Sequence, residues 1–202
     1  MKYSKSTIKY ELIFHELNSN KSELIFQDKK VEVHTIPLHH RIYTNGFLFK
    51  EKQKPRKLNM NIINQFEEIE ICDYNNLKAG KDFLLSSGEV LKNSTLTLCP
   101  KKSLRYAYCS DTSYREDIIE IIKGSDLLYH ESTFLSDKED LAAKTRHSTA
   151  KQAAEIASKA KVKKLILGHF SSRYDDISLF REEGKEIFPN TDIAQTGKVF
   201  SV

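Results

Sequence analysis

The sequence predicts an α/β fold, and three observations support that prediction. The first fifty residues contain short β-rich runs in which apolar and polar residues alternate. From Arg105 onward, short apolar runs alternate with segments of helical periodicity, a pattern that implies helices packed on a sheet. Between these regions, residues 50–102 show only modest periodicity, which favours an inserted segment over part of the core. With 202 residues, the chain is long enough for one domain with a core of its own.

The N-terminal region predicts an antiparallel meander. In residues 8–15, apolar side chains alternate with Lys9 and Glu11, which is the period-2 pattern of a half-buried strand. Turn-prone stretches then separate three further predicted strands, at residues 24–26, 31–36 and 46–49.

The C-terminal region predicts strands that alternate with helices. Residues 113–116 and 149–152 resemble capping boxes, each expected to open a helix, and Gly124 is expected to end the first of these helices. The predicted strands lie at 105–109, 127–129, 162–167 and 193–202, and the predicted helices lie at 118–122, 149–160 and 177–187.

Composition excludes several classes of protein. Hydrophobic residues make up 39% and charged residues 30%, which is typical of a folded, well-solvated protein. No apolar run is long enough to cross a bilayer, and Met1–Lys5 is not followed by a hydrophobic signal segment, so we expect a cytoplasmic location and no membrane partner. The three cysteines form no CxxC pair, which argues against a disulfide framework or a cysteine zinc site. A net charge of +4 is too mild to indicate nucleic acid by itself.

Polar residues follow the ends of three predicted C-terminal strands. Asp111, Glu131 (beside His130) and His169 stand at these ends, where ligands bind in α/β folds. His40, between two predicted strands, adds a second imidazole to Asp111 and His169. Imidazole and carboxylate ligands without a thiolate suit a catalytic zinc ion, or another borderline divalent ion, with open positions for water and substrate.

Five segments, in order along the chain, give a specific resemblance. Residues 128–134 are similar to a HEAT motif with Ser132 in place of alanine, and residues 146–150 contain an HST motif. The other three segments are residues 37–49, 108–112 and 167–174. Together they resemble ribonuclease Z, a tRNA 3′-processing endonuclease family of the metallo-β-lactamase superfamily. The resemblance implies the C-terminal part of an αββα sandwich as a single partial domain over residues 1–202.

The resemblance also implies roles for the metal-binding residues. His40 would bind one Zn²⁺ ion, His169 would bind the other, and Asp111 would bridge the two. Two metals at a scissile phosphate activate water and offset charge in the transition state.

Catalytic and phosphate-binding roles follow from the same resemblance. His147, with Glu131 as its partner, would support proton transfer or charge stabilisation at the phosphate. Arg173 would bind the phosphate through its guanidinium group. The helix that begins near Thr149 would offer free backbone amides to an anion.

Residues 50–102 match, in position, the flexible arm with which this family binds tRNA. The segment begins with a basic cluster, which suits phosphate contacts that do not depend on sequence. The expected RNA contacts are Lys52, Lys54, Arg56 and Lys57. Precursor tRNA is the implied partner, and a homodimer is the implied assembly.

One family motif is missing from the sequence. Family members carry an HxHxDH motif that supplies three zinc ligands and an aspartate assigned as the general base, and none of the seven histidines here forms it. We therefore expect the chain to begin at what is the interior of a family member. Two alternatives to an enzyme of this family stay open: a non-catalytic remnant that binds tRNA or dimerises, and another phosphodiesterase of the same fold.

Overall fold

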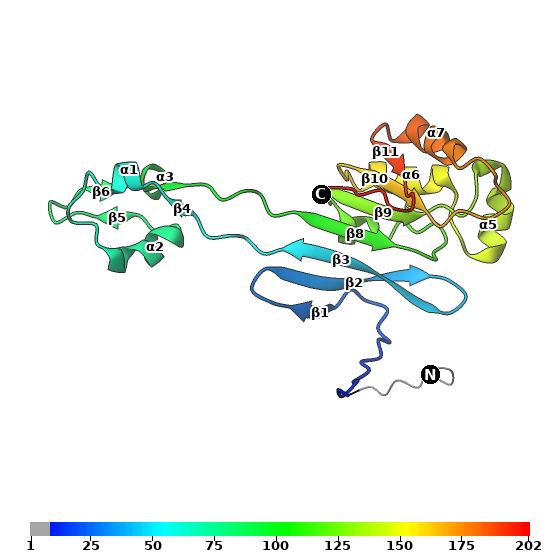
Figure 1. Cartoon of the computed structure of the whole chain (residues 1–202), viewed down its shortest axis with the longest axis horizontal. Helices are drawn as coiled ribbons and strands as arrows, with labels where there is room; N and C mark the ends of the chain where they lie inside the picture. The colour runs from blue at the N-terminus through cyan, green and yellow to red at the C-terminus, as the bar shows by residue number, and fades with distance from the viewer. Residues whose placement is uncertain (1–8) are drawn as a thin grey trace.

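A seven-stranded mixed sheet forms the main body of the computed structural model, which describes residues 9–202 (Figure 1). The strand order is β1-β2-β3-β8-β9-β10-β11. Neighbours from β1 to β8 pair antiparallel, and neighbours from β8 to β11 pair parallel. The strands are β1 Leu24–Gln27, β2 Val31–His39, β3 Tyr43–Glu51, β8 Arg105–Cys109, β9 Leu127–Glu131, β10 Leu165–Gly168 and β11 Thr191–Ile193.

The predicted antiparallel meander is confirmed for β1, β2 and β3, but the predicted strand at residues 8–15 is wrong. Ile8 lies outside the described residues, and residues 9–15 contain no strand. Tyr10, Ile13 and Phe14 are all exposed. An alternating pattern becomes a strand only where another strand pairs with its backbone groups, and residues 9–15 have no such neighbour within the described chain.

Helices cover one face of the sheet. Because neighbouring residues of a strand point to opposite faces, Ala107 and Cys109 of β8 face the helices and join the main core. Tyr106 and Tyr108 point to the other face, where Tyr108 stays exposed. The helices are α4 Ile119–Ile122, α5 Glu139–Thr145, α6 Ala150–Lys159 and α7 Ser178–Ile187, with a 3₁₀ turn, η2, at Ser136–Lys138. The main body of residues 9–202 thus consists of one helical layer on the seven-stranded sheet.

One of the two predicted capping boxes forms. Thr149 Oγ1 accepts a hydrogen bond from the Gln152 amide, and the Gln152 side chain accepts one from the Thr149 amide, so α6 begins as predicted. The box at residues 113–116 is wrong, because the Ser113 hydroxyl bonds to His39 and α4 begins only at Ile119. Gly124 ends α4 with a φ of +66°, in the left-handed region where glycine is favoured.

The predicted strand at residues 162–167 is confirmed in part, as β10, whereas the predicted strand at residues 193–202 is wrong except at Ile193. Strand β10 begins at Leu165 rather than at residue 162, and β11 ends at Ile193. Residues 194–202 form no strand; the chain turns at Gly197, where φ is +78°. Beyond this turn, the Lys164 and Lys198 ammonium groups lie over the ring of Phe200.

The segment inserted between β3 and β8 folds into a small unit of its own. Figure 1 shows it at the end of two long connections, projecting away from the sheet. Ile63, Ile69, Leu77 and Leu96 form a separate hydrophobic core, where we had expected only an extended insertion. The unit contains β4 Lys57–Leu58, α1 Met60–Ile63, η1 Ile71–Asp73, α2 Tyr74–Lys78, β5 Phe83–Leu84, β6 Val90–Leu91, α3 Asn93–Leu96 and β7 Thr97–Leu98. None of the helices in residues 9–202 is both long and apolar enough to span a membrane.

Candidate functional site

Four side chains meet at the carboxyl edge of the parallel strands. Asp111 follows β8, Glu131 ends β9, His169 follows β10, and His147 precedes α6. One ligand atom of each residue lies within 4.8 Å of those of the other three. The parallel pairing of β8, β9 and β10 explains this convergence, because their carboxyl ends lie side by side.

The backbone at this site is strained. Among the described residues, four that are not glycine have a positive φ, and three of them belong to this region: Asp111 at +57°, Arg146 at +59° and His169 at +60°. Side chains with a Cβ rarely adopt this conformation, and such residues gather at functional sites. Arg146 ends α5 in this conformation and immediately precedes His147.

Glu131 is fully buried and accepts five hydrogen bonds. Its carboxylate oxygens take the backbone amides of Thr112, Thr133 and Ser148, together with the Thr133 hydroxyl and the Nδ1 atom of His147. Burial alone would raise the pKa of Glu131, but the hydrogen bonds from His147 and Thr133 outweigh it and lower the pKa below its usual range. The ionised carboxylate therefore connects the segment after β8, the end of β9 and the start of α6.

His147 is the direct partner of Glu131. The His147 Nδ1 atom lies 2.7 Å from Glu131 Oε1, and this hydrogen bond raises the pKa of the imidazole against the opposing effect of burial. Because an ionised carboxylate can only accept, Nδ1 carries the hydrogen and Nε2 is left for a ligand or a substrate.

Asp111 and His169 fit a metal ion. His169 Nε2 lies 3.0 Å from Asp111 Oδ1, and this one oxygen is shielded from solvent and has no hydrogen-bond partner within residues 9–202, although 44% of the Asp111 side chain is exposed. A buried carboxylate oxygen without a donor is costly unless a cation or a proton satisfies it. One carboxylate and imidazole nitrogens are ligands that zinc accepts in catalytic sites.

His40 lies next to the group but is not part of it. Its ring centroid is 4.8 Å from that of His147, and its Nδ1 atom is 2.9 Å from the carbonyl oxygen of Arg146. Arg146 in turn donates a hydrogen bond to the carbonyl oxygen of His40. The structure thus brings His40 to the edge of the site while its Nδ1 atom contacts the backbone.

The predicted phosphate-binding residues lie in different surroundings. Arg173 is exposed and contacts Ser171. Lys52 contacts Gln27 and Glu32 at the sheet, while Arg56 is half-buried and donates to Thr97 inside the inserted unit. The remaining two, Lys54 and Lys57, are exposed.

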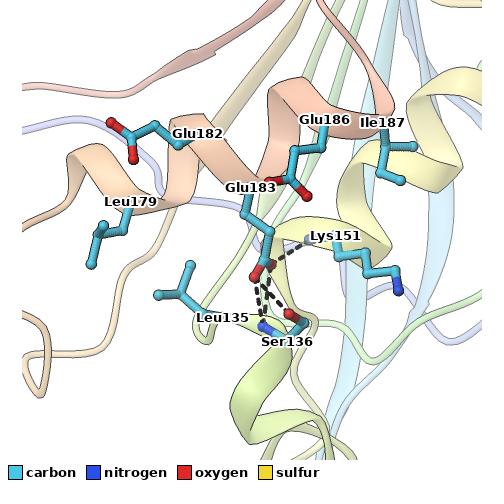
Figure 2. Close-up of a pocket in the computed structure, with 8 residues that line it drawn as sticks. All are labelled: Leu135, Ser136, Lys151, Leu179, Glu182, Glu183, Glu186 and Ile187. Atoms are coloured by element: carbon cyan, nitrogen blue, oxygen red, sulfur yellow. Dashed lines mark hydrogen bonds between the residues drawn. The ribbon is translucent and has the colours of Figure 1, made fainter.

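The predicted anion site at the start of α6 is wrong, because the first amides of the helix already have partners. The Ala150 amide donates to Phe134, the Lys151 amide donates to Glu183, and the Gln152 amide donates to Thr149. Figure 2 shows the Glu183 carboxylate of α7 between Lys151 and Ser136, in a cavity of about 470 Å³. No sequence pattern indicated this contact, because Glu183 is distant from α6 along the chain.

Comparison with known proteins identifies the family. A family model described as "Beta-lactamase superfamily domain" matches residues 15–170. Proteins named Ribonuclease Z are similar to the chain: that of Bacteroides thetaiotaomicron is 44% identical over 97% of this chain, and that of Phocaeicola vulgatus is 46% identical over 92%. The chain spans 62% and 60% of the length of these curated relatives. The predicted resemblance to ribonuclease Z is confirmed.

Solved structures support the fold. The metallo-β-lactamase fold protein YhfI from Bacillus subtilis matches 92% of this chain with a TM-score of 0.58 at 15% identity, and the match covers 54% of YhfI. The short form of human tRNase Z matches 89% of this chain with a TM-score of 0.51 at 22% identity, covering 46% of that protein. These structures confirm the predicted fold class, and with the family match they show that the chain belongs to the beta-lactamase superfamily.

Proposed function

We propose that this chain forms the C-terminal part of a zinc-dependent endoribonuclease that removes the 3′ trailer from precursor tRNA. The observation that carries the proposal is the convergence of Asp111, Glu131, His147 and His169 at one edge of the sheet. The similarity to proteins named Ribonuclease Z supplies the reaction, and it extends over nearly the whole chain.

Asp111 and His169 are the residues we propose as zinc ligands, with His40 as a third. Asp111 would bridge two ions, with His40 on one and His169 on the other. Zinc would supply Lewis-acid stabilisation of the scissile phosphate and an activated water. The unpartnered Asp111 Oδ1 and its position against His169 Nε2 support this assignment.

His147 and Glu131 are the proposed acid–base pair. Because Glu131 raises the pKa of His147, the imidazole holds a proton on Nε2 up to a higher pH than an isolated histidine does. It can donate that proton to the leaving 3′ oxygen or stabilise charge on the phosphate. Arg173 is proposed to bind the phosphate through its guanidinium group.

The inserted unit is proposed as the arm that binds precursor tRNA away from the cleaved bond, with domain bounds of residues 50–102. Its separate core and its position at the end of two long connections suit a part that contacts RNA at a distance from the sheet. We also propose a homodimer, as the family resemblance implies, and a cytoplasmic location.

We expect a polypeptide of residues 1–202 to bind at most one zinc ion per chain, and to bind it weakly. The proposed ligands among the described residues are only His40, Asp111 and His169, and His40 lies outside the group whose ligand atoms converge. Elemental analysis after dialysis measures the stoichiometry. Asp111→Asn should remove the bound zinc, whereas Asp137→Asn, at an exposed aspartate of η2, should not. Two tightly held zinc ions per chain would contradict this prediction.

The lysines of the arm should give tRNA binding a steep salt dependence. Replacing Lys52, Lys54 and Lys57 by alanine should flatten the log–log slope of affinity against salt by roughly two to three units, at about 0.7–0.9 per phosphate contact. Binding should weaken for all tRNAs alike, because phosphate contacts carry little sequence information. Arg56 is kept because its contact with Thr97 is part of the inserted unit.

Filter binding across a salt series measures this slope. A control variant that removes three lysines from the sheet body, Lys123, Lys161 and Lys185, has the same change in net charge. We expect its slope to equal that of the parent. Equal slopes for the parent and the arm variant would show that these lysines do not contact RNA.

A further inference from the structure

Thr133 connects the buried Glu131 to His169. Its Oγ1 atom lies 2.7 Å from Glu131 Oε2 and 2.9 Å from His169 Nδ1. The side chain is buried, with 7% of its surface exposed, and it stands two residues beyond the end of β9. This hydroxyl is the only direct link from Glu131 to His169 among the hydrogen bonds of residues 9–202.

The direction of these two hydrogen bonds follows from their donors. The ionised Glu131 carboxylate has no hydrogen to donate and can only accept. The Thr133 hydroxyl, 2.7 Å from Oε2, therefore donates its single hydrogen to that oxygen. Toward His169 the hydroxyl can then offer only a lone pair. His169 Nδ1 must therefore carry a hydrogen and donate it to Thr133.

This hydrogen bond determines what the other ring nitrogen can do. A neutral imidazole with its hydrogen on Nδ1 has a lone pair on Nε2, the atom that faces Asp111 Oδ1 at 3.0 Å. Neither atom then carries a hydrogen, so a cation bound by both would offset the repulsion between them. The opposite tautomer would place a hydrogen on Nε2 and prevent it from binding a metal ion.

We propose that Thr133 is a positioning residue that fixes the tautomer and the ring orientation of His169 for metal binding. Through it, Glu131 acts on His169 as well as on His147. Metal-binding histidines commonly donate their second ring N–H to an oxygen acceptor, and loss of such an acceptor costs roughly 10- to 100-fold in metal affinity. The inference rests on the metal site proposed above.

Zinc affinity of the 202-residue chain, measured by competition with a chromophoric chelator, tests the role of the hydroxyl. Thr133→Val, which keeps the shape and removes the hydroxyl, should bind Zn²⁺ roughly 10- to 100-fold more weakly. Thr133→Ser should restore an affinity close to that of the parent, and Thr35→Val, at a buried threonine of β2, should have no effect. Equal zinc affinity for Thr133→Val and the parent would overturn the proposal.

The tautomer itself is measured on the metal-free Asp111→Ala chain, because in the unaltered chain the Asp111 carboxylate, 3.0 Å from His169 Nε2, would itself accept a hydrogen from that atom. Long-range ¹H–¹⁵N spectra at about pH 8.5, where histidine is neutral, distinguish the two forms, and His169→Gln assigns the signal. We expect the hydrogen on Nδ1, and finding it on Nε2 would overturn the proposal. If the chain binds no zinc, the metal site fails, yet this spectrum still decides whether Thr133 orients His169.

Discussion

Replacing Glu131 by alanine is expected to lower the free energy of unfolding by about 3–5 kcal/mol, the cost of removing one partner from a buried ionic pair. The substitution removes the acceptor for five donors, including the amides of Thr112 and Ser148 and the imidazole of His147. Buried donors without an acceptor are costly in themselves. Urea denaturation of the metal-free chain at neutral pH measures the change.

An exposed glutamate provides the control for this measurement. Glu120 of α4 pairs with Lys123 at the surface, so Glu120→Ala should change stability by less than about 0.5 kcal/mol. A similar decrease in the free energy of unfolding of both variants would contradict the prediction, because it would show that the buried hydrogen bonds of Glu131 stabilise the fold no more than a surface ion pair does.

The Glu131–His147 pair also predicts a pH dependence. The lowered pKa of Glu131 gives stability that is present above its ordinary value of 4.5 and is lost as the pH falls through the lowered pKa. The raised pKa of His147 gives stability that is present below its ordinary value of 6.5 and is lost as the pH rises through the raised pKa. The difference in the free energy of unfolding between the parent and Glu131→Gln should therefore be largest between pH 4.5 and pH 6.5, as urea denaturation across a pH series would measure.

Sequence patterns located most of the site because it depends on strand ends and short motifs. Asp111, Glu131 and His169 could be expected together, since parallel strands place their carboxyl ends at one edge. The Thr149 capping box likewise depends only on residues within one turn of helix. Features of this kind can be predicted from a short stretch of sequence, because they do not depend on residues far away along the chain.

The features that sequence patterns missed depend on contacts between distant residues. The Ser113 hydroxyl does not cap a helix, because it is hydrogen-bonded to His39 of β2. Glu183 satisfies an amide of α6 from a different helix, which removes the expected anion site. Apolar and polar residues alternate over residues 8–12, but residues 9–15 have no neighbouring strand within the described chain. In each case a tertiary contact, or the lack of one, overrode a local preference.

Cleavage of precursor tRNA tests the proposed function most directly. The printed sequence lacks the HxHxDH motif that supplies most ligands in the resembled family, so residues 1–202 alone should show no measurable cleavage. A chimera can supply the remainder from the Bacteroides thetaiotaomicron Ribonuclease Z, of which this chain spans 62% at 44% identity. We expect that chimera to release the 3′ trailer.

Asp111→Ala in the chimera should lower the cleavage rate by roughly a thousandfold or more, since the metal ions it would bridge contribute several kcal/mol to the transition state. Asp137→Ala, at an exposed aspartate of η2, should leave the rate unchanged. The measurement is the release of trailer from a labelled precursor tRNA. Cleavage that persists at the parental rate after Asp111→Ala, or robust cleavage by residues 1–202 alone, would contradict the account.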